Sequence, residues 1–351
     1  MDAEFPDAAT VDTAVELAVR APSVHNSQPW RWRADPRDRA RVHLLADPAR
    51  RLHRVDPAGR DLLISCGAAL HHAVVAFAAL GWHATVRRLP DPADPTHLAV
   101  LELRRDRAEA ATVGLAAAIP RRRTDRRLYS SWPVADGDIA LMAARVARGG
   151  VMLRRLVAMD TLRPLIAAAV RHHVADAAYL AELTAWSGRY GSTAGVPASN
   201  TPRPEPAAGV PARVFAGPAL AQPPGAEPAD DHSVLLALGT AADDATAWLR
   251  AGEATSVVLL TATALGLASC PVTEPLEVEQ TRAAVRTDVF GDAGYPQMLV
   301  RVGWAPVNAD PLPATPRRAL AEVWQPADSA TRSPAAPTTA ARSRLPAGCS
   351  H

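Results

Sequence analysis

Apolar residues recur at helical spacing in several stretches of the chain, while in others they alternate with polar residues or run without a break, as in strands. The helical spacing predicts helices at 10–19, 61–81, 110–119, 136–147, 162–186, 244–268 and 277–285. The other pattern predicts strands at 31–33, 42–46, 85–88, 98–103, 151–156, 233–239 and 297–302. The helix at 61–81 is apolar on nearly every side, so we expect it to be buried.

Two segments lack such periodicity. Residues 187–231 are crowded with Pro, Gly and Ala, which predicts a long loop, and loops of this length are usually lids or disordered. Residues 326–351 are rich in Pro, Ala, Ser and Thr, which predicts a disordered tail.

Part of the chain repeats itself. The stretch 67–81 aligns without a gap on 252–266, at a constant offset of 185 residues (252 − 67 and 266 − 81), and both stretches begin and end with Gly. Chance alignment of two Ala-rich helices is one explanation. The other is a duplicated helix at the centre of two similar halves, which would mimic the two-fold interface of a dimer within one chain.

A short polar segment lies between two prolines, Pro22 and Pro29, each of which fixes φ and favours extended geometry in the preceding residue. Between them Ser23, Asn26 and Gln28 offer hydrogen-bond donors and acceptors that could read the edge of a flat heterocycle. The same residue types also favour an ordinary helix-to-strand turn.

The motif Ala-Pro-Ser-x-x-Asn-x-Gln-Pro-Trp at 21–30 resembles the signature loop of the nitroreductase-like flavoproteins, and the surrounding sequence is similar to the Acg-type branch over most of 10–325. This resemblance implies an α+β fold with mostly antiparallel sheets and long central helices. It also implies two fused halves, at 1–109 and 110–325, that form an intramolecular pseudo-dimer with one FMN site between them. In that family the loop contacts FMN, so Pro22, Ser23, Asn26 and Gln28 become candidate cofactor ligands.

Three further segments resemble FMN-binding elements of the same family. Arg122, Thr124 and Arg126 match an Arg-x-Ser-x-Arg element, in which forked, permanently charged guanidinium groups suit a phosphate. Pro271, Val272 and Thr273 match a Gly-Leu…Pro segment whose backbone faces the flavin, although many members carry an acidic residue where Thr273 stands. Arg317 and Arg318 match a C-terminal basic pair. Each segment also has a structural alternative. Residues 122–126 could be a solvated basic stretch, 271–273 the end of a helix with a proline stop, and 317–318 a surface pair.

Composition limits the other possibilities. The chain has 351 residues, a net charge of +2 and three cysteines without a C-x-x-C spacing, so we expect no disulfide framework and no metal site. All 38 basic residues are Arg, so a single arginine means little. We expect no nucleic-acid or membrane partner, a cytoplasmic location, and either a monomer or a homodimer.

The first hypothesis is therefore an FMN-dependent oxidoreductase that carries electrons from NAD(P)H to a small planar acceptor, such as a nitroaromatic or a quinone. Because a cofactor would carry the chemistry, no catalytic side chain is assigned. The second is a flavin-binding or storage protein whose 187–231 lid excludes substrate. A scaffold without cofactor is the third.

Overall fold

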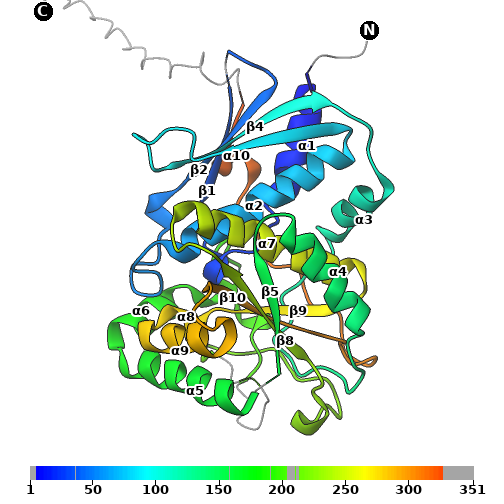
Figure 1. Ribbon diagram of the computed structural model, residues 1–351. Helices are drawn as coiled ribbons and strands as arrows, with labels where there is room; N and C mark the ends of the chain where they lie inside the picture. The colour runs from blue at the N-terminus through cyan, green and yellow to red at the C-terminus, as the bar shows by residue number, and fades with distance from the viewer. Residues whose placement is uncertain are drawn as a thin grey trace, which may run out of the picture.

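The protein, described by a computed structural model over residues 5–35, 37–157, 159–189, 191–203, 210 and 213–326, has two main sheets with a pair of long helices between them (Figure 1). The helices are α1 Ala8–Ala18, α2 Arg60–Ala79, α3 Ala110–Ala118, α4 Asp136–Ala147, α5 Met159–Ala175, α6 Ala177–Ala185, α7 Ala245–Ala264, α8 Glu274–Glu277, α9 Glu279–Phe290 and α10 Leu320–Val323. The strands are β1 Trp30–Ala34, β2 Arg41–Ala46, β3 Trp82–Arg88, β4 His97–Arg105, β5 Met152–Leu156, β6 Ser187–Arg189, β7 Val196–Pro197, β8 Val234–Thr240, β9 Ala268–Val272, β10 Tyr295–Gly303 and β11 Trp324–Gln325. Short 3-10 turns are η1 Val24–Asn26, η2 Pro48–Arg50, η3 Ala198–Asn200 and η4 Pro228–Asp230.

The first sheet has the strand order β11-β1-β2-β4-β3, and all its pairs are antiparallel except β1 with β11. Along β1, Trp30 and Trp32 are buried while Arg31 and Arg33 are exposed, so the alternation of the sequence sets which face meets the core. The parallel partner β11 comes from the C-terminal end of the described chain, and Trp324 pairs with Trp32.

The second sheet has the order β5-β8-β10-β9 and is antiparallel throughout. Every residue of β8 is buried because helices cover both faces of this sheet. Leu236 and Leu238 pack in one cluster with α4 and α7, while Leu235 and Ala237 pack in another with α5 and α9. The prediction of mostly antiparallel sheets with long central helices is confirmed.

The two central helices α2 and α7 cross at Gly67 and Gly252. A Cβ atom on Gly67 would lie 2.0 Å from the Leu249 carbonyl oxygen, and one on Gly252 would lie 2.0 Å from that of Ile64. The two glycines also lie against each other, and their positions differ by 185, the offset of the sequence repeat. The aligned stretches are therefore the two helices that pack on each other.

Four predicted boundaries are corrected. The helix at 162–186 is two helices, α5 and α6, because Asp176 begins a new one by accepting hydrogen bonds from the amides of Ala178 and Tyr179. The helix at 244–268 ends at Ala264, and residue 268 instead starts β9. The helix at 277–285 is divided at Val278 between α8 and α9. The loop at 187–231 contains the parallel pair β6 and β7.

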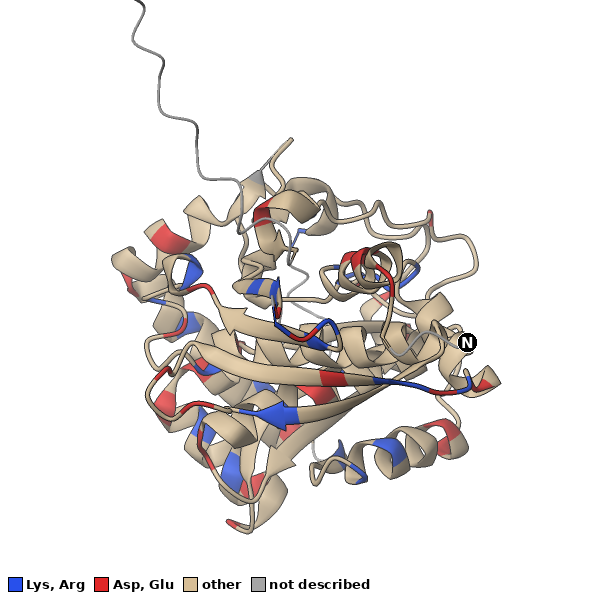
Figure 2. Cartoon of the chain, turned by 90° about the horizontal axis from the view of Figure 1, so that it is seen from above, with Lys and Arg blue, Asp and Glu red and all other residues tan. Residues whose placement is uncertain are grey.

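The predicted disordered tail lies outside the described residues from 327 onward, and so do residues 190, 204–209 and 211–212 of the 187–231 segment. By length and composition α2 could cross a membrane, but 72% of its apolar window is buried inside the protein, as in a core helix. Seen from above, arginines and carboxylates are interspersed along the elements (Figure 2).

Candidate functional site

The loop between α1 and β1 is held in an unusual backbone conformation. His25, Asn26 and Gln28 have φ angles of 46°, 53° and 51°, in the left-handed region that non-glycine residues rarely adopt. Two side-chain hydroxyl groups stabilise this shape: the Gln28 amide donates to Ser23 Oγ at 2.9 Å and the Val24 amide to Ser65 Oγ at 3.0 Å. Such locally strained backbone is typical of binding sites and has to be held in place by its surroundings.

The carboxamides of this loop bind other parts of the chain. Asn26 Nδ2 donates to the Gly195 carbonyl at 3.0 Å, and Gln28 Nε2 donates to that of Thr193 at 2.7 Å. Arg317 Nη1 donates to Asn26 Oδ1 at 3.0 Å, and the Arg318 amide donates to Gln28 Oε1 at 2.9 Å. Asn26 and Gln28 thus connect the 187–231 segment and the C-terminal segment to the loop.

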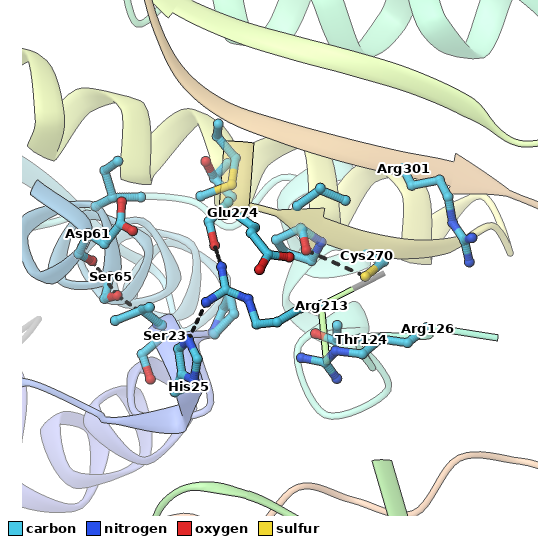
Figure 3. Close-up of a pocket in the computed structure, with 18 of the residues that line it drawn as sticks. Ser23, His25, Asp61, Ser65, Thr124, Arg126, Arg213, Cys270, Glu274 and Arg301 are labelled. Atoms are coloured by element: carbon cyan, nitrogen blue, oxygen red, sulfur yellow. Dashed lines mark hydrogen bonds between the residues drawn. The ribbon is translucent and has the colours of Figure 1, made fainter. Parts of the chain in front are cut away.

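A cleft opens beside the loop, between α2, the 124–126 stretch, the 270–274 stretch and the 187–231 segment. Its empty space, part of it open to solvent, is about 1150 Å³. Seven of the twelve predicted cofactor ligands line it: Pro22, Ser23, Thr124, Arg126, Pro271, Val272 and Thr273. Figure 3 shows Ser23 and His25 from the loop on one side and Thr124 and Arg126 on the other. Residues of three of the four sequence motifs therefore meet around one cleft.

Three of the remaining predicted residues, Arg122, Arg317 and Arg318, line a second hollow that also receives Arg20 and Arg123. Arg122 of the second hollow lies next to a residue of the first, since its Nη1 donates to Thr124 Oγ1 at 3.4 Å. Asn26 and Gln28 line neither hollow.

Arg122 stands out in this cluster because it is buried without a negative partner. It is 6% exposed, its Nε–H has no hydrogen-bond partner, and no carboxylate within the described chain pairs with it. Burial, together with the charges of Arg123 and Arg126, lowers the pKa of Arg122 to about 10. A buried cation of this kind is costly unless an anion compensates it.

Arg317 and Arg318 are already engaged. Arg317 donates to the carbonyl groups of Val19, Arg20 and Ala21 at 3.0–3.2 Å, just beyond the end of α1. Arg318 lies 3.6 Å from Asp47 and 3.4 Å from Glu322. Burial and the neighbouring arginines lower the pKa of Arg317 to about 9, so an anion here would relieve repulsion across the whole cluster.

The 187–231 segment covers the opposite wall of the cleft. Arg126 Nη1 donates to the Asn200 carbonyl at 3.2 Å, and the Arg126 guanidinium lies 5.0 Å from the centre of the Phe215 ring. Pro202 and Val210 also line the cleft. The segment therefore contacts the same arginine that the sequence motif predicts for the cofactor.

Sequence reasoning missed Arg213, the residue that fixes this segment to the cleft floor (Figure 3). Its guanidinium donates to His25 Nε2 at 3.0 Å and to Thr273 Oγ1 at 3.2 Å, contacts Tyr179 Oη, and pairs with Glu277 at 2.5 Å. Burial opposes ionisation of Glu277, but Arg213 outweighs it and keeps the pKa of that carboxyl below its usual value. No periodic pattern marks Arg213, because the surrounding sequence is Pro- and Ala-rich.

The contact with Arg213 influences the protonation of the His25 ring, and His25 is 7% exposed. Burial, and next the charge of Arg213, lower the pKa of His25 to about 3, so the ring is neutral near pH 7. Since Nε2 accepts from Arg213, the ring proton is assigned to Nδ1, which has no hydrogen-bond partner among the residues that the structure describes. His25 lines the cleft, and its Nδ1–H is therefore a buried donor that the described residues leave unsatisfied.

These features suit a planar ligand that bears an anionic group. Proline, aliphatic and polar side chains line the cleft, and Arg126 in its wall and Arg122 beside it have no carboxylate partner among the described residues. Within the described ranges, no group of three or more His, Cys, Asp or Glu residues is placed to hold a metal ion.

The chain is similar to several known proteins. A family model described as the nitroreductase family matches residues 150–304. A Mycobacterium tuberculosis protein provisionally named as an NAD(P)H nitroreductase is 62% identical over 323 residues, which cover 92% of this chain and 93% of that protein. The M. tuberculosis protein acg, with the same provisional name, is 39% identical over 90% of this chain and 95% of its own length. A crystal structure of a nitroreductase with bound FMN from Bacteroides fragilis is 14% identical and covers 56% of this chain and 90% of its own, with a TM-score of 0.37.

Proposed function

The chain belongs to the nitroreductase family, and from that premise we propose that it is an FMN-dependent oxidoreductase. Its electron donor would be NAD(P)H and its acceptor a small planar molecule of the quinone or nitroaromatic type. The resemblance found in the sequence, including that to the Acg-type branch, is confirmed by the relatives, whose names refer to NAD(P)H nitroreductases.

One observation carries the cofactor proposal: within the described ranges, the buried guanidinium of Arg122 has an unpartnered Nε–H and no carboxylate paired with it. A phosphate dianion would compensate the charge of Arg122 and accept a hydrogen bond from its free Nε–H. The residues present therefore fit a phosphorylated ligand, and FMN is the phosphorylated flavin of this family. Arg122 would hold the phosphate, with Arg123 and the already anchored Arg317 adding to the positive potential.

The ring of the flavin would occupy the first cleft, between the Pro22–Ser23 side and the backbone of 271–273. When bound, FMN supplies hydride transfer. Arg126 would favour negative charge on the reduced ring, because its own guanidinium lacks a carboxylate partner in the described chain. The side chains Ser23, Thr124 and His25 would position the ring through hydrogen bonds.

We also propose the two-half organisation, with halves at 1–109 and 110–325. Its support is the crossing of α2 and α7 at positions related by the offset of 185 residues. The first half contributes the strained loop and the second contributes the arginines and the 271–273 backbone, which would make one site per chain. Strand β11 would then return from the second half to complete the sheet of the first.

The alternative remains a flavin-binding or storage protein in which 187–231 acts as a lid. The observation in its favour is the anchoring of Arg213 to His25 and Thr273, which line the cleft, and to the carboxylate of Glu277. If the lid opens, the same 187–231 segment would control the entry of substrate.

The remaining parts of the proposal concern partners and location. We expect a monomer or a homodimer without nucleic-acid or membrane partners. A cytoplasmic location accords with Cys66 and Cys270, which are free and buried in the described part of the chain.

The test uses the full chain purified without added flavin. The enzyme hypothesis predicts a yellow protein that binds FMN stoichiometrically and oxidises NADH or NADPH when 1,4-benzoquinone is supplied. FMN binding without turnover supports the storage alternative, and a colourless protein that does not bind FMN refutes both.

A further inference from the structure

Asp61 is a buried carboxyl group in the cleft wall that the proposed cofactor contacts leave unused. It lies in the first turn of α2, is 2% exposed, and shares the cleft wall with Ser23 and Ser65 (Figure 3). Neither of its carboxyl oxygens has a hydrogen-bond partner in the described structure. Arg60 Nη2 lies 2.8 Å from Oδ1 as a charge pair, without the alignment of a hydrogen bond.

The charges around Asp61 come from four elements or loops. Arg60 precedes it on α2, Asp56 lies in the preceding loop, Glu277 is at the end of α8, and Arg213 belongs to the 187–231 segment. Arg60 also donates to the Gln297 carbonyl at 2.7 Å and to that of Leu276 at 3.3 Å, so it serves several acceptors.

The balance of these effects lets the carboxyl group keep its proton at a higher pH than an ordinary aspartate. Burial raises the pKa of Asp61 to about 7, with Arg60 opposing the shift and Asp56 and Glu277 adding to it. A general acid is most effective when its pKa lies near the working pH.

We propose that Asp61, in its carboxylic acid form, donates a proton to the oxygen of a quinone-type acceptor bound in this cleft; the proposal rests on the oxidoreductase function above. A quinone becomes a hydroquinone by gaining one hydride and one proton. The hydride comes from the bound flavin after its reduction by NAD(P)H, and the O–H bond of Asp61 breaks as a new O–H bond forms on the acceptor. The resulting carboxylate is held beside Arg60 until water returns a proton.

Two acceptors separate proton donation from electron delivery. Reduction of 1,4-benzoquinone consumes protons, whereas reduction of ferricyanide takes up electrons only. The measurement is the ratio of kcat for benzoquinone to kcat for ferricyanide, with NADH or NADPH as donor, for the wild type, Asp61→Asn and the exposed control Asp288→Asn on α9.

General acids typically contribute 10²–10⁴-fold, so we expect the ratio to fall by about 100-fold in Asp61→Asn and to stay unchanged in Asp288→Asn. In the wild type the ratio should fall as the pH rises through about 7, where the acid form is lost. An infrared carboxylic acid C=O band that titrates in the same range should be present in the FMN-loaded wild type and absent from Asp61→Asn.

A ratio within twofold of wild type in Asp61→Asn overturns the proposal. If Asp61→Asn loses FMN, the proposal is tested instead by the pH profile of the wild-type ratio and by the infrared band. A wild-type ratio that stays constant across pH 7 also overturns the proposal. Failure of the oxidoreductase function itself would look different, since the wild type would then reduce neither benzoquinone nor ferricyanide.

Discussion

Gly67 and Gly252 face each other where the two central helices cross, and each occupies the space that a Cβ atom on the other would need. A Cβ on Gly67 would approach the Gly252 Cα to 3.0 Å, and one on Gly252 would approach the Gly67 Cα to 2.9 Å. The neighbouring pair His71 and Ser256, 2.7 Å apart between Nδ1 and Oγ, also has the 185-residue separation. The cleft walls on α2 therefore depend on close contact with α7.

Gly252→Ala should destabilise the fold, because its new methyl group would meet the Ile64 carbonyl oxygen at 2.0 Å and push the helices apart. Overpacking of a tight interface costs roughly 3 kcal/mol. Gly114→Ala in α3 is the matched control: apart from its chain neighbours and its own helix backbone, no atom of the described residues lies within 4 Å of its Cβ position. Ala should stabilise that helix by about 0.5–1 kcal/mol. Urea unfolding measures both, and equal stabilities for the two variants would contradict the close crossing.

Arg213→Ala should release the 187–231 segment from the cleft floor. Glu277 would lose its cation, and breaking a buried ion pair from one side costs roughly 3–5 kcal/mol. We expect faster FMN dissociation and stronger iodide quenching of flavin fluorescence than in Arg203→Ala, an exposed control in the same segment. NAD(P)H oxidation that rises in Arg213→Ala supports gating by the lid, while identical quenching in the two variants would show that Arg213 does not hold it.

His25 should make the protein sensitive to acid. Its pKa is depressed from 6.5 to about 3 in the folded chain, so the unfolded chain binds the proton more readily between these values. The stability that His25 contributes is therefore present above pH 6.5 and is lost as the pH falls toward 3, by at most about 1.4 kcal/mol per pH unit.

The free energy of unfolding, measured from pH 7 to pH 4, checks this expectation. His25→Gln keeps an acceptor for Arg213 but cannot titrate, so its stability should depend less on pH than that of the wild type. His53→Gln, at an exposed position, should behave as the wild type does. A His25→Gln profile parallel to that of the wild type would contradict the buried neutral imidazole.

Periodicity predicted most elements of this fold because their burial follows the sequence pattern. Trp30 and Trp32 alternate with arginines in β1, and β8 is an uninterrupted apolar run covered on both faces. The break at Asp176 also had a sequence signal, an N-cap residue before an apolar stretch, which the continuous helical spacing obscured. Strand β11 had none, since it is two residues long and exists through its pairing with β1.

For the site, the motifs predicted which segments meet but not the full set of residues. Ser23, Thr124, Arg126 and the 271–273 backbone line one cleft as expected. Roles that arise only from the tertiary fold were missed: Arg213 reaches the cleft from a segment without periodicity, and Asp61 gains its importance from burial beside Arg60. Whether the twelve predicted residues contact FMN stays a prediction.

The central claim is that Arg122 holds the phosphate of a flavin, and equilibrium binding of FMN and riboflavin to the apoprotein tests it most directly. The two ligands differ by the phosphate alone. Loss of a charged hydrogen-bonding partner costs roughly 1.5–3 kcal/mol, so Arg122→Met should weaken FMN binding about 10–100-fold and leave riboflavin binding unchanged. Arg121→Met, an exposed neighbour, should bind both as the wild type does. If Arg122→Met still prefers FMN over riboflavin by the wild-type factor, the phosphate lies elsewhere and the account is contradicted.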